Sequence, residues 1–249
     1  MVMSIEGRFP NLSWDWVGCA LNPYFEGNNS VTKGGAMVED DGFMNETPEN
    51  WFFGICASRT INGDMRLPHN ISATWERAAE MGQVLLVTAD GSIDCSAAMR
   101  SIDDSDQEEL VAQLHYCEAV AAIGSLAVGG SLVLKVCISL ARSNLSTHAY
   151  LHQHTPLTHT HTHTHTQMFT LFEHSSICLV HLLSGVFEYT SICKPTMSTP
   201  GNSETYIVCK GFKGVDEQYK RKLLSFTGEV YILTYRQSSF ICRRYLLLS

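Results

Sequence analysis

The feature that most constrains the fold is a short apolar run, QVLLVTADG, which extends from Gln83 to Gly91. A continuous apolar run of this length predicts a β-strand that is buried on both faces, as in a parallel sheet covered by helices. The next segment, DDSDQEELVAQLHYCEAVAAIGSLAVGG, has acidic residues at its start, apolar residues at helical spacing, and Gly129 and Gly130 at its end. It predicts a helix, and SLVLK, from Ser131 to Lys135, predicts a second buried strand.

The second half of the chain continues this alternation. MFTLFEHSSICLVHLLSGVF, which starts at Met168, predicts a helix, and EYTSICKP predicts the strand that follows it. A loop, TMSTPGNSE, separates this strand from the last predicted strand, TYIVCKGF. The order strand, helix, strand, helix, strand, strand predicts an α/β fold with a largely parallel sheet and helices on both faces.

Composition narrows the class of protein. The 249 residues, 45% of them hydrophobic, suit one mixed domain or one and a half. A net charge of −8 argues against a generally basic nucleic-acid binder, although a local basic groove is compatible with it. Nine cysteines without a CxxC pair indicate reduced thiols rather than a disulfide framework. We expect neither a signal peptide nor a membrane span, because no apolar run has the required length and flanks.

Three ionisable residues lie at the ends of predicted strands: Asp90, Lys135 and Glu204. Taken singly, Asp90 can be a turn residue, Lys135 a surface lysine with a packed alkyl stem, and Glu204 a solvated loop carboxylate. In open α/β sheets, however, ligands bind outside the carboxyl ends of the strands. The three residues together therefore predict one site, with Lys135 as a general base.

Several long motifs, in the right order, resemble one protein family. VTADGSIDC, LHYCEAVAAIGSLAVGGSLVLK and the segment from MFTLFEH to VCKGFKG are similar to the FtsJ-like cap-specific mRNA 2′-O-methyltransferases. WDWVGCALNPYFEGN and NGDMRLPHNI resemble the member that acts on the second transcribed nucleotide. The resemblance covers most of residues 13–135 and 168–214.

This resemblance implies a Rossmann-like, S-adenosylmethionine-dependent methyltransferase sheet with a lysine–aspartate–lysine–glutamate tetrad. By motif, Asp90, Lys135 and Glu204 match its aspartate, second lysine and glutamate. The resemblance implies that Lys135 takes the proton from a ribose 2′-hydroxyl, and that Asp90, Asp64 and Trp14 lie near the cofactor. Capped mRNA would be the partner, without a membrane or a structural metal, in the nucleus, the cytoplasm or both.

The chain also departs from the family pattern. A first lysine and a glycine-containing cofactor turn precede the tryptophan-rich segment in the family, whereas here the chain starts about a dozen residues before WDW. We therefore expect the first strand and the cofactor glycine loop to be missing, and S-adenosylmethionine to bind poorly or not at all. A second hypothesis follows, in which the chain is a catalytically inactive RNA-binding or interaction module that keeps part of the fold.

The histidine–threonine repeat LTHTHTHTHTQM interrupts the resemblance directly after the proposed base. Residues 136–167 hold seven of the 11 histidines, and the codons allowed at both ends can form splice sites. We interpret this insertion as a retained intron, and a metal site formed by the repeat as the competing interpretation. The predicted organisation is methyltransferase sequence over 1–135 and 168–214, the insertion over 136–167, and a tail over 215–249 that can be read-through.

Overall fold

The fold was analysed in a computed structural model, which describes residues 15–25, 41–54, 61–91, 104–137, 174–195 and 204–227, together with positions 8 and 11. Its main sheet has the strand order β3-β4-β6-β5. The bounds of these strands are Val84–Ala89 for β3, Leu126–Cys137 for β4, Glu204–Phe212 for β6 and Phe187–Cys193 for β5. β3 and β4 pair in parallel, whereas β6 runs antiparallel to both β4 and β5. The predicted α/β order and the positions of the four strands are confirmed.

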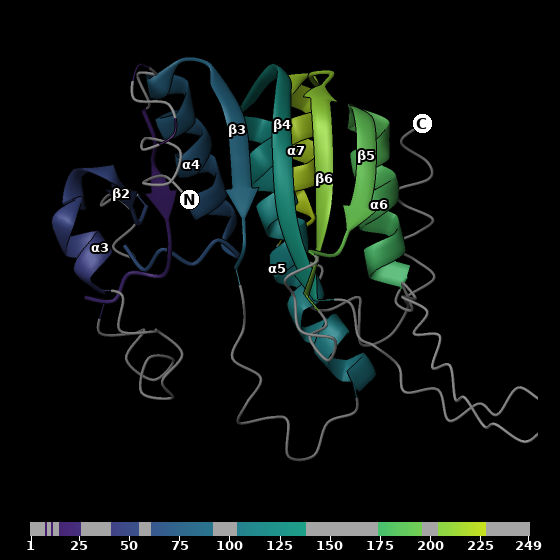
Figure 1. Cartoon of the computed structure of the whole chain (residues 1–249), viewed down its shortest axis with the longest axis horizontal. Helices are drawn as coiled ribbons and strands as arrows, with labels where there is room; N and C mark the ends of the chain where they lie inside the picture. Colours follow the sequence, from purple (N-terminus) through teal and green to yellow (C-terminus); the bar gives the residue numbers. More distant parts are fainter. Residues whose placement is uncertain are drawn as a thin grey trace, which may run out of the picture.

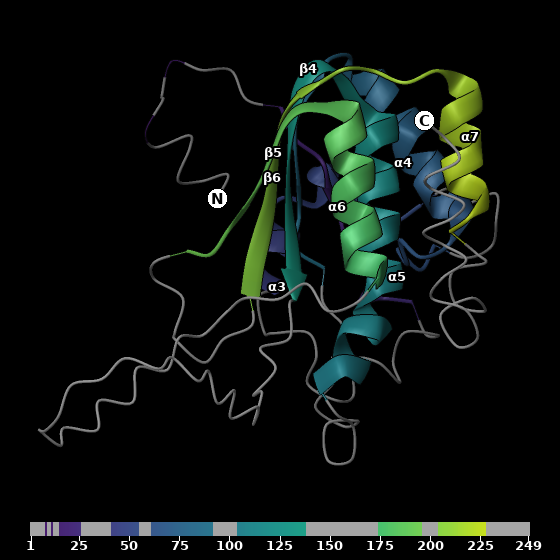
Figure 2. The same cartoon turned by 90° about the vertical axis from the view of Figure 1, so that its right-hand side faces the viewer.

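Four helices pack on one side of this sheet (Figures 1 and 2). They are α4 (Pro68–Met81), α5 (Asp104–Ser125), α6 (His174–Val186) and α7 (Glu217–Ser225). The expectation of a largely parallel sheet with helices on both faces is wrong for the described residues, because in the main sheet only β3 and β4 pair in parallel and α4 to α7 lie on one face (Figure 2). The prediction that β3 is buried on both faces is wrong for the described residues, where Leu85 is 63% and Leu86 36% exposed. The reason is that β3 is an edge strand there, because it pairs with β4 alone.

The boundary between α5 and β4 also differs from the prediction. α5 ends at Ser125, and Gly129 and Gly130 lie inside β4 rather than at the end of the helix. The register between β3 and β4 shifts in this region, and Gly129 has a φ of 84°. The two glycines therefore lie at an irregularity of the strand. Glycine adopts the backbone conformation needed there as readily as it adopts that of a helix end.

Two of the four helices that pack on the main sheet, α4 and α7, were not predicted. α4 begins with Pro68 at its first turn and ends at Gly82, whose φ is 90°. These are ordinary start and stop signals of a helix. α7 begins after Asp216, whose side chain accepts a hydrogen bond from the Tyr219 backbone N–H at 2.6 Å. α7 lies in the segment expected to be a tail, yet its Leu223 is completely buried against the core.

The first part of the chain forms a small two-stranded parallel sheet beside the main one (Figure 1). Its elements are β1 (Gly18–Cys19), α3 (Asp41–Glu46), the 3₁₀ helix η2 (Pro48–Asn50) and β2 (Trp51–Phe52). Backbone hydrogen bonds from Asn22 N–H to the Asn62 carbonyl, at 2.8 Å, and from Gly63 N–H to the Phe53 carbonyl, at 3.0 Å, join it to the loop before α4. The loop that contains Asp64 is thus held on both sides.

The core lies between the main sheet and α5. Cys117, Ala119, Val120 and Ala122 of α5 are completely buried, and most of them are small. Small side chains let the helix lie close to the sheet, where Leu132, Leu134, Ile207 and Cys209 are buried in turn. The alternate residues of β4 and β6 therefore face away from the helices.

Candidate functional site

Asp90 and Lys135 lie side by side at the carboxyl edge of the main sheet. Ala89 of β3 pairs with Leu134 of β4, so that the next positions along these parallel strands, Asp90 and Lys135, are neighbours. Asp90 is exposed, and Lys135 is half-buried on the face of β4 opposite to the buried Leu134. Neither the Asp90 carboxylate nor the Lys135 ammonium group makes a hydrogen bond or ion pair within the described part of the chain.

Glu204 is the first residue of β6 and comes to the same edge by its backbone register. Its Cα pairs with that of Cys137, and Tyr206 pairs with Lys135. Because side chains alternate along a strand, Glu204 and Lys135 occupy positions on the same face of the sheet. The backbone positions of Asp90, Lys135 and Glu204 thus gather at one edge, whereas the role of each residue stays a prediction.

Two ionisable residues of α5, His115 and Glu118, lie behind this edge and were not predicted. Both are buried, with exposed fractions of 4% and 9%. Their spacing of three residues places them on one side of the helix, toward the end of β3. The signal that could have revealed them is the presence of ionisable side chains inside the apolar stretch LHYCEAVAAIG.

Glu118 connects α5 to the turn that contains Asp90. Its Oε1 accepts a hydrogen bond from the Gly91 backbone N–H at 2.8 Å. The pKa of Glu118 is raised to about 7, mainly because the carboxyl group is buried. The hydrogen bond from Gly91 lowers this pKa, the negative charge of Asp90 raises it further, and the positive charge of Lys135 lowers it. Glu118 is therefore partly protonated near neutral pH.

His115 has the opposite response to burial. Its pKa falls to about 4, first because the ring is buried and second because Lys135 carries a positive charge nearby. The imidazole is consequently neutral at pH 7 and adds no charge to the site. The charge of Lys135 contributes to the pKa of both α5 residues, lowering that of His115 and opposing the rise of that of Glu118.

Replacement of Glu118 by glutamine gives a prediction about pH. A group whose pKa is higher in the folded than in the unfolded state stabilises the fold at low pH, and this stability is lost as the pH rises. For Glu118 the loss falls between pH 4.5 and about 7, and it amounts to at most about 3 kcal/mol. We expect urea denaturation to show that the free energy of unfolding of the wild type, relative to Glu118→Gln, decreases from pH 5 to pH 8. A stability difference that stays constant with pH would contradict the raised pKa of Glu118. Titration of His115 does not affect this comparison, because His115 is present in both proteins.

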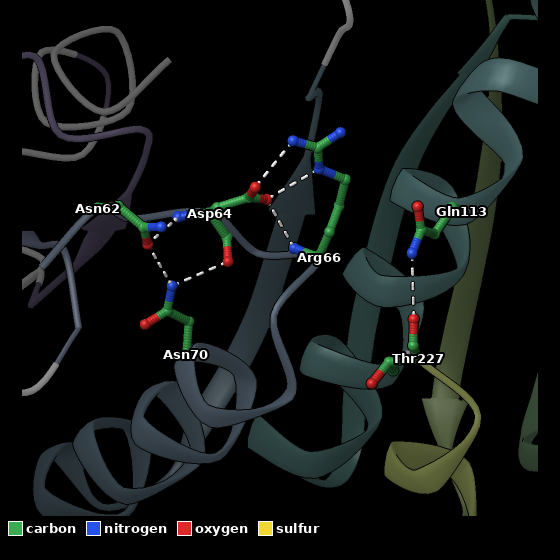
Figure 3. Close-up of polar contacts among 6 residues, drawn as sticks. All are labelled: Asn62, Asp64, Arg66, Asn70, Gln113 and Thr227. Carbon is green, nitrogen blue, oxygen red and sulfur yellow. Dashed lines mark hydrogen bonds and ion pairs between the residues drawn. The ribbon is translucent and has the colours of Figure 1, made fainter. Parts of the chain in front are cut away.

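Asp64 lies in the loop before α4, within a network of hydrogen bonds (Figure 3). Its Oδ1 accepts hydrogen bonds from the Arg66 backbone N–H and Nε, both at 2.9 Å, and its Oδ2 pairs with Arg66 Nη2 at 2.8 Å. Asn70 Nδ2 donates to the Asp64 carbonyl and to Asn62 Oδ1, each at 2.9 Å. The carboxylate is thus fixed by its own loop.

The charges of this loop also reach the helix behind the edge. Burial opposes ionisation of Asp64, but the hydrogen bonds and positive charge of Arg66 outweigh it and hold the Asp64 pKa below its usual value. Burial raises the pKa of Cys117 to about 12, with smaller contributions from the charges of Asp64, Arg66 and Glu118. Asp64 therefore lies within electrostatic reach of the α5 residue next to Glu118. Its predicted contact with the cofactor stays a prediction, and Trp14 lies outside the described residues.

The rest of the described chain offers no second site of an obvious kind. The described residues contain no group of three or more His, Cys, Asp or Glu side chains that could hold a metal ion. The histidine–threonine repeat lies outside the described residues. Among the described helices, none is both long and apolar enough to cross a lipid bilayer.

Several known proteins are similar to this chain in sequence. No family model matches the chain. The chain is 35% identical over 226 residues to the cap-specific mRNA (nucleoside-2′-O-)-methyltransferase 2 of Mus musculus, which covers 90% of this chain and 24% of that protein. The protein of the same name from Danio rerio is 37% identical over 204 residues, or 82% of this chain and 21% of that protein.

A more distant relative comes from a virus. A protein named as a probable methyltransferase of African swine fever virus is 30% identical over 226 residues, which make up 87% of this chain and 43% of that protein. The chain spans about a quarter of the length of the animal relatives that it matches. Similarity to methyltransferases accords with a Rossmann-like α/β sheet, as the resemblance implied.

Proposed function

Because the chain belongs to the family of cap-specific mRNA (nucleoside-2′-O-)-methyltransferases, we propose that it is an RNA 2′-O-methyltransferase, or the part of one that carries its catalytic edge. The substrate would be capped mRNA, and the target the ribose of a cap-proximal nucleotide, the second by resemblance. The observation that carries this proposal is the adjacency of Asp90 and Lys135 in the register of β3 and β4. Glu204 occupies the corresponding edge of β6.

The methyl donor in this proposal is S-adenosylmethionine. Asp90 presents an exposed carboxylate at the carboxyl end of a parallel strand, without a hydrogen-bond partner among the described residues. Such a group suits a cofactor that carries positive charge and hydrogen-bond donors, and this edge is where cofactors bind in open α/β sheets. Asp64 lies in the neighbouring loop, but Arg66 already occupies both of its carboxylate oxygens. We therefore propose Asp90 as the principal carboxylate that contacts the cofactor, with Asp64 and Trp14 as the further positions that the resemblance implies.

Lys135 is the proposed general base. When bound, S-adenosylmethionine would supply a methyl group on a positively charged sulfur. Transfer of this methyl group to the ribose oxygen would break the sulfur–carbon bond and leave the sulfur as a neutral thioether. The neutral amine of Lys135 would accept the proton of the ribose 2′-hydroxyl, so that the oxygen can attack the methyl carbon. Asp90 and Glu204 would orient the lysine and the hydroxyl, and correct placement of the reactants would account for much of the rate enhancement.

The nucleus, the cytoplasm or both are the proposed location, since capped mRNA occurs in both compartments.

The competing hypothesis of an inactive RNA-binding or interaction module would preserve the sheet and bind RNA without transferring a methyl group. Methyl transfer therefore separates the two hypotheses.

The test is incubation of the purified chain with S-adenosylmethionine that carries a labelled methyl group and with capped or uncapped RNA of the same sequence. We expect label on the ribose of a cap-proximal nucleotide, identified after nuclease digestion, and much less label on uncapped RNA. Label on a base, or equal label on both RNAs, would contradict the proposed function. Binding of capped RNA without any transfer would support the inactive module instead.

A further inference from the structure

The buried carboxyl group of Glu118 lies directly behind the turn between β3 and the segment that follows it. Gly91, the residue after Asp90, donates its backbone N–H to Glu118 Oε1 at 2.8 Å across a sequence separation of 27 residues. This N–H belongs to the peptide group that joins Asp90 to Gly91. Because a peptide group is planar, its hydrogen bond to α5 also fixes the backbone of Asp90.

Gly91 allows an unusually close approach between the turn and the helix. A Cβ atom at this position would lie 2.5 Å from Glu118 Oε1 and 3.1 Å from Leu114 Cδ2. Any other residue would therefore push the turn away from α5 or displace the carboxyl group. The turn rests on the helix because residue 91 has no side chain.

Glu118 is poorly explained as a residue that only stabilises the core. It is 9% exposed, and its Oε2 is buried without a hydrogen-bond partner among the described residues. A buried, half-satisfied carboxyl group costs stability, and an apolar side chain would fill the same space at lower cost. The charges that act on Glu118 are those of Asp90 and Lys135, the two central residues of the proposed site.

We propose that Glu118 is a positioning residue, which holds Asp90 beside Lys135 through the Gly91 backbone N–H. This inference rests on the proposed function for its catalytic consequence, but the hydrogen bond itself can be tested without it. Glu118 is not a catalytic residue in this proposal, since it touches the turn and not the reacting atoms. The group that it needs is a hydrogen-bond acceptor, which a glutamine side chain also supplies.

The test compares Glu118→Ala, Glu118→Gln and the control Tyr116→Phe in the whole chain. Tyr116 lies two residues earlier on α5, is also buried, and donates its hydroxyl to the Leu223 carbonyl at 2.8 Å, on the side that faces α7. Its replacement removes a buried hydrogen bond of the same helix without touching the turn. All four proteins are measured for kcat, for the KM of capped RNA and for hydrogen exchange of the Gly91 amide by NMR.

We expect Glu118→Ala to lower kcat about tenfold or more, to change KM less than about twofold, and to accelerate exchange of the Gly91 amide by a similar factor of about ten. Glu118→Gln should keep the amide protected and kcat within about threefold of the wild type, and Tyr116→Phe should lower the melting temperature without changing kcat. Unchanged protection of the Gly91 amide in Glu118→Ala would overturn the inference, as would equal losses of kcat in the alanine, glutamine and phenylalanine variants.

The amide measurement keeps the two proposals separate. If the wild type transfers no methyl group but Glu118→Ala selectively exposes the Gly91 amide, the positioning inference stands and the proposed function fails. If the wild type is active and Glu118→Ala has full kcat, the function stands and the inference fails.

Discussion

Replacement of Lys135 by alanine is expected to lower kcat for methyl transfer to capped RNA by about 10²- to 10⁴-fold, the range typical of a lost general base. The reason is geometric, since Lys135 lies beside Asp90 in the strand register and is half-buried at the carboxyl edge of the sheet. Binding of S-adenosylmethionine and of capped RNA should change much less than kcat. The measurement is the single-turnover rate of label transfer, together with the dissociation constants of both ligands.

Lys222→Ala is the matched control for this variant. Lys222 is exposed on α7, which lies on the helix-covered side of the sheet (Figure 2). Lys135 follows the buried Leu134 in β4 and therefore occupies a position on the other face. Both variants lose one positive charge, so a general effect of charge on RNA binding would appear in both. Equal loss of activity in Lys135→Ala and Lys222→Ala would contradict the assigned role of Lys135.

Replacement of Gly124 by alanine is expected to have the largest effect on stability. Gly124 lies in α5 where α4 crosses it, and a Cβ atom there would run into the indole ring of Trp75. Trp75 Nε1 also donates a hydrogen bond to the Ala121 carbonyl at 3.2 Å, which the displaced ring would lose. Overpacking together with this loss should lower the free energy of unfolding by about 3 kcal/mol, measured by urea denaturation at pH 7.

Gly185→Ala provides the comparison. Gly185 also lies in a helix, α6, but a Cβ atom there would meet nothing within 4 Å. Alanine favours helix over glycine, so this variant should be neutral or more stable by up to about 1 kcal/mol. A similar loss of stability in both variants would show that Gly124 is not required by its contact with Trp75.

The sequence predicted the strands of the main sheet well, because their signal is local. VLLVTA and TYIVCKGF are runs of apolar and β-branched residues bounded by turn residues, and β3 and β6 follow them within one or two positions. The end of α5 was misplaced because Gly129 and Gly130 can end a helix or interrupt a strand, and only pairing with β3 decides between the two. Pro68 and Gly82, by contrast, are unambiguous local signals for the two ends of α4.

The site was predictable in part, because the ends of the strands can be located from local sequence signals. Asp90 and Lys135 come directly from the rule that ligands bind at the carboxyl ends of strands, and the register brings them together. Glu118 could not be assigned in this way, because its role depends on the contact between α5 and Gly91, residues far apart in the sequence. The exposure of Leu85 likewise depends on which strands pair with β3, which the strand's own residues do not specify.

Methyl transfer at the edge formed by Asp90 and Lys135 can be tested by an experimental structure of the chain with S-adenosylhomocysteine and a short capped RNA. We expect the ribose 2′-oxygen of a cap-proximal nucleotide to lie within hydrogen-bonding distance of Lys135 Nζ, roughly 3 Å, with Asp90 beside the cofactor. A 2′-oxygen bound at another edge of the sheet, with Lys135 and Asp90 touching neither ligand, would contradict it.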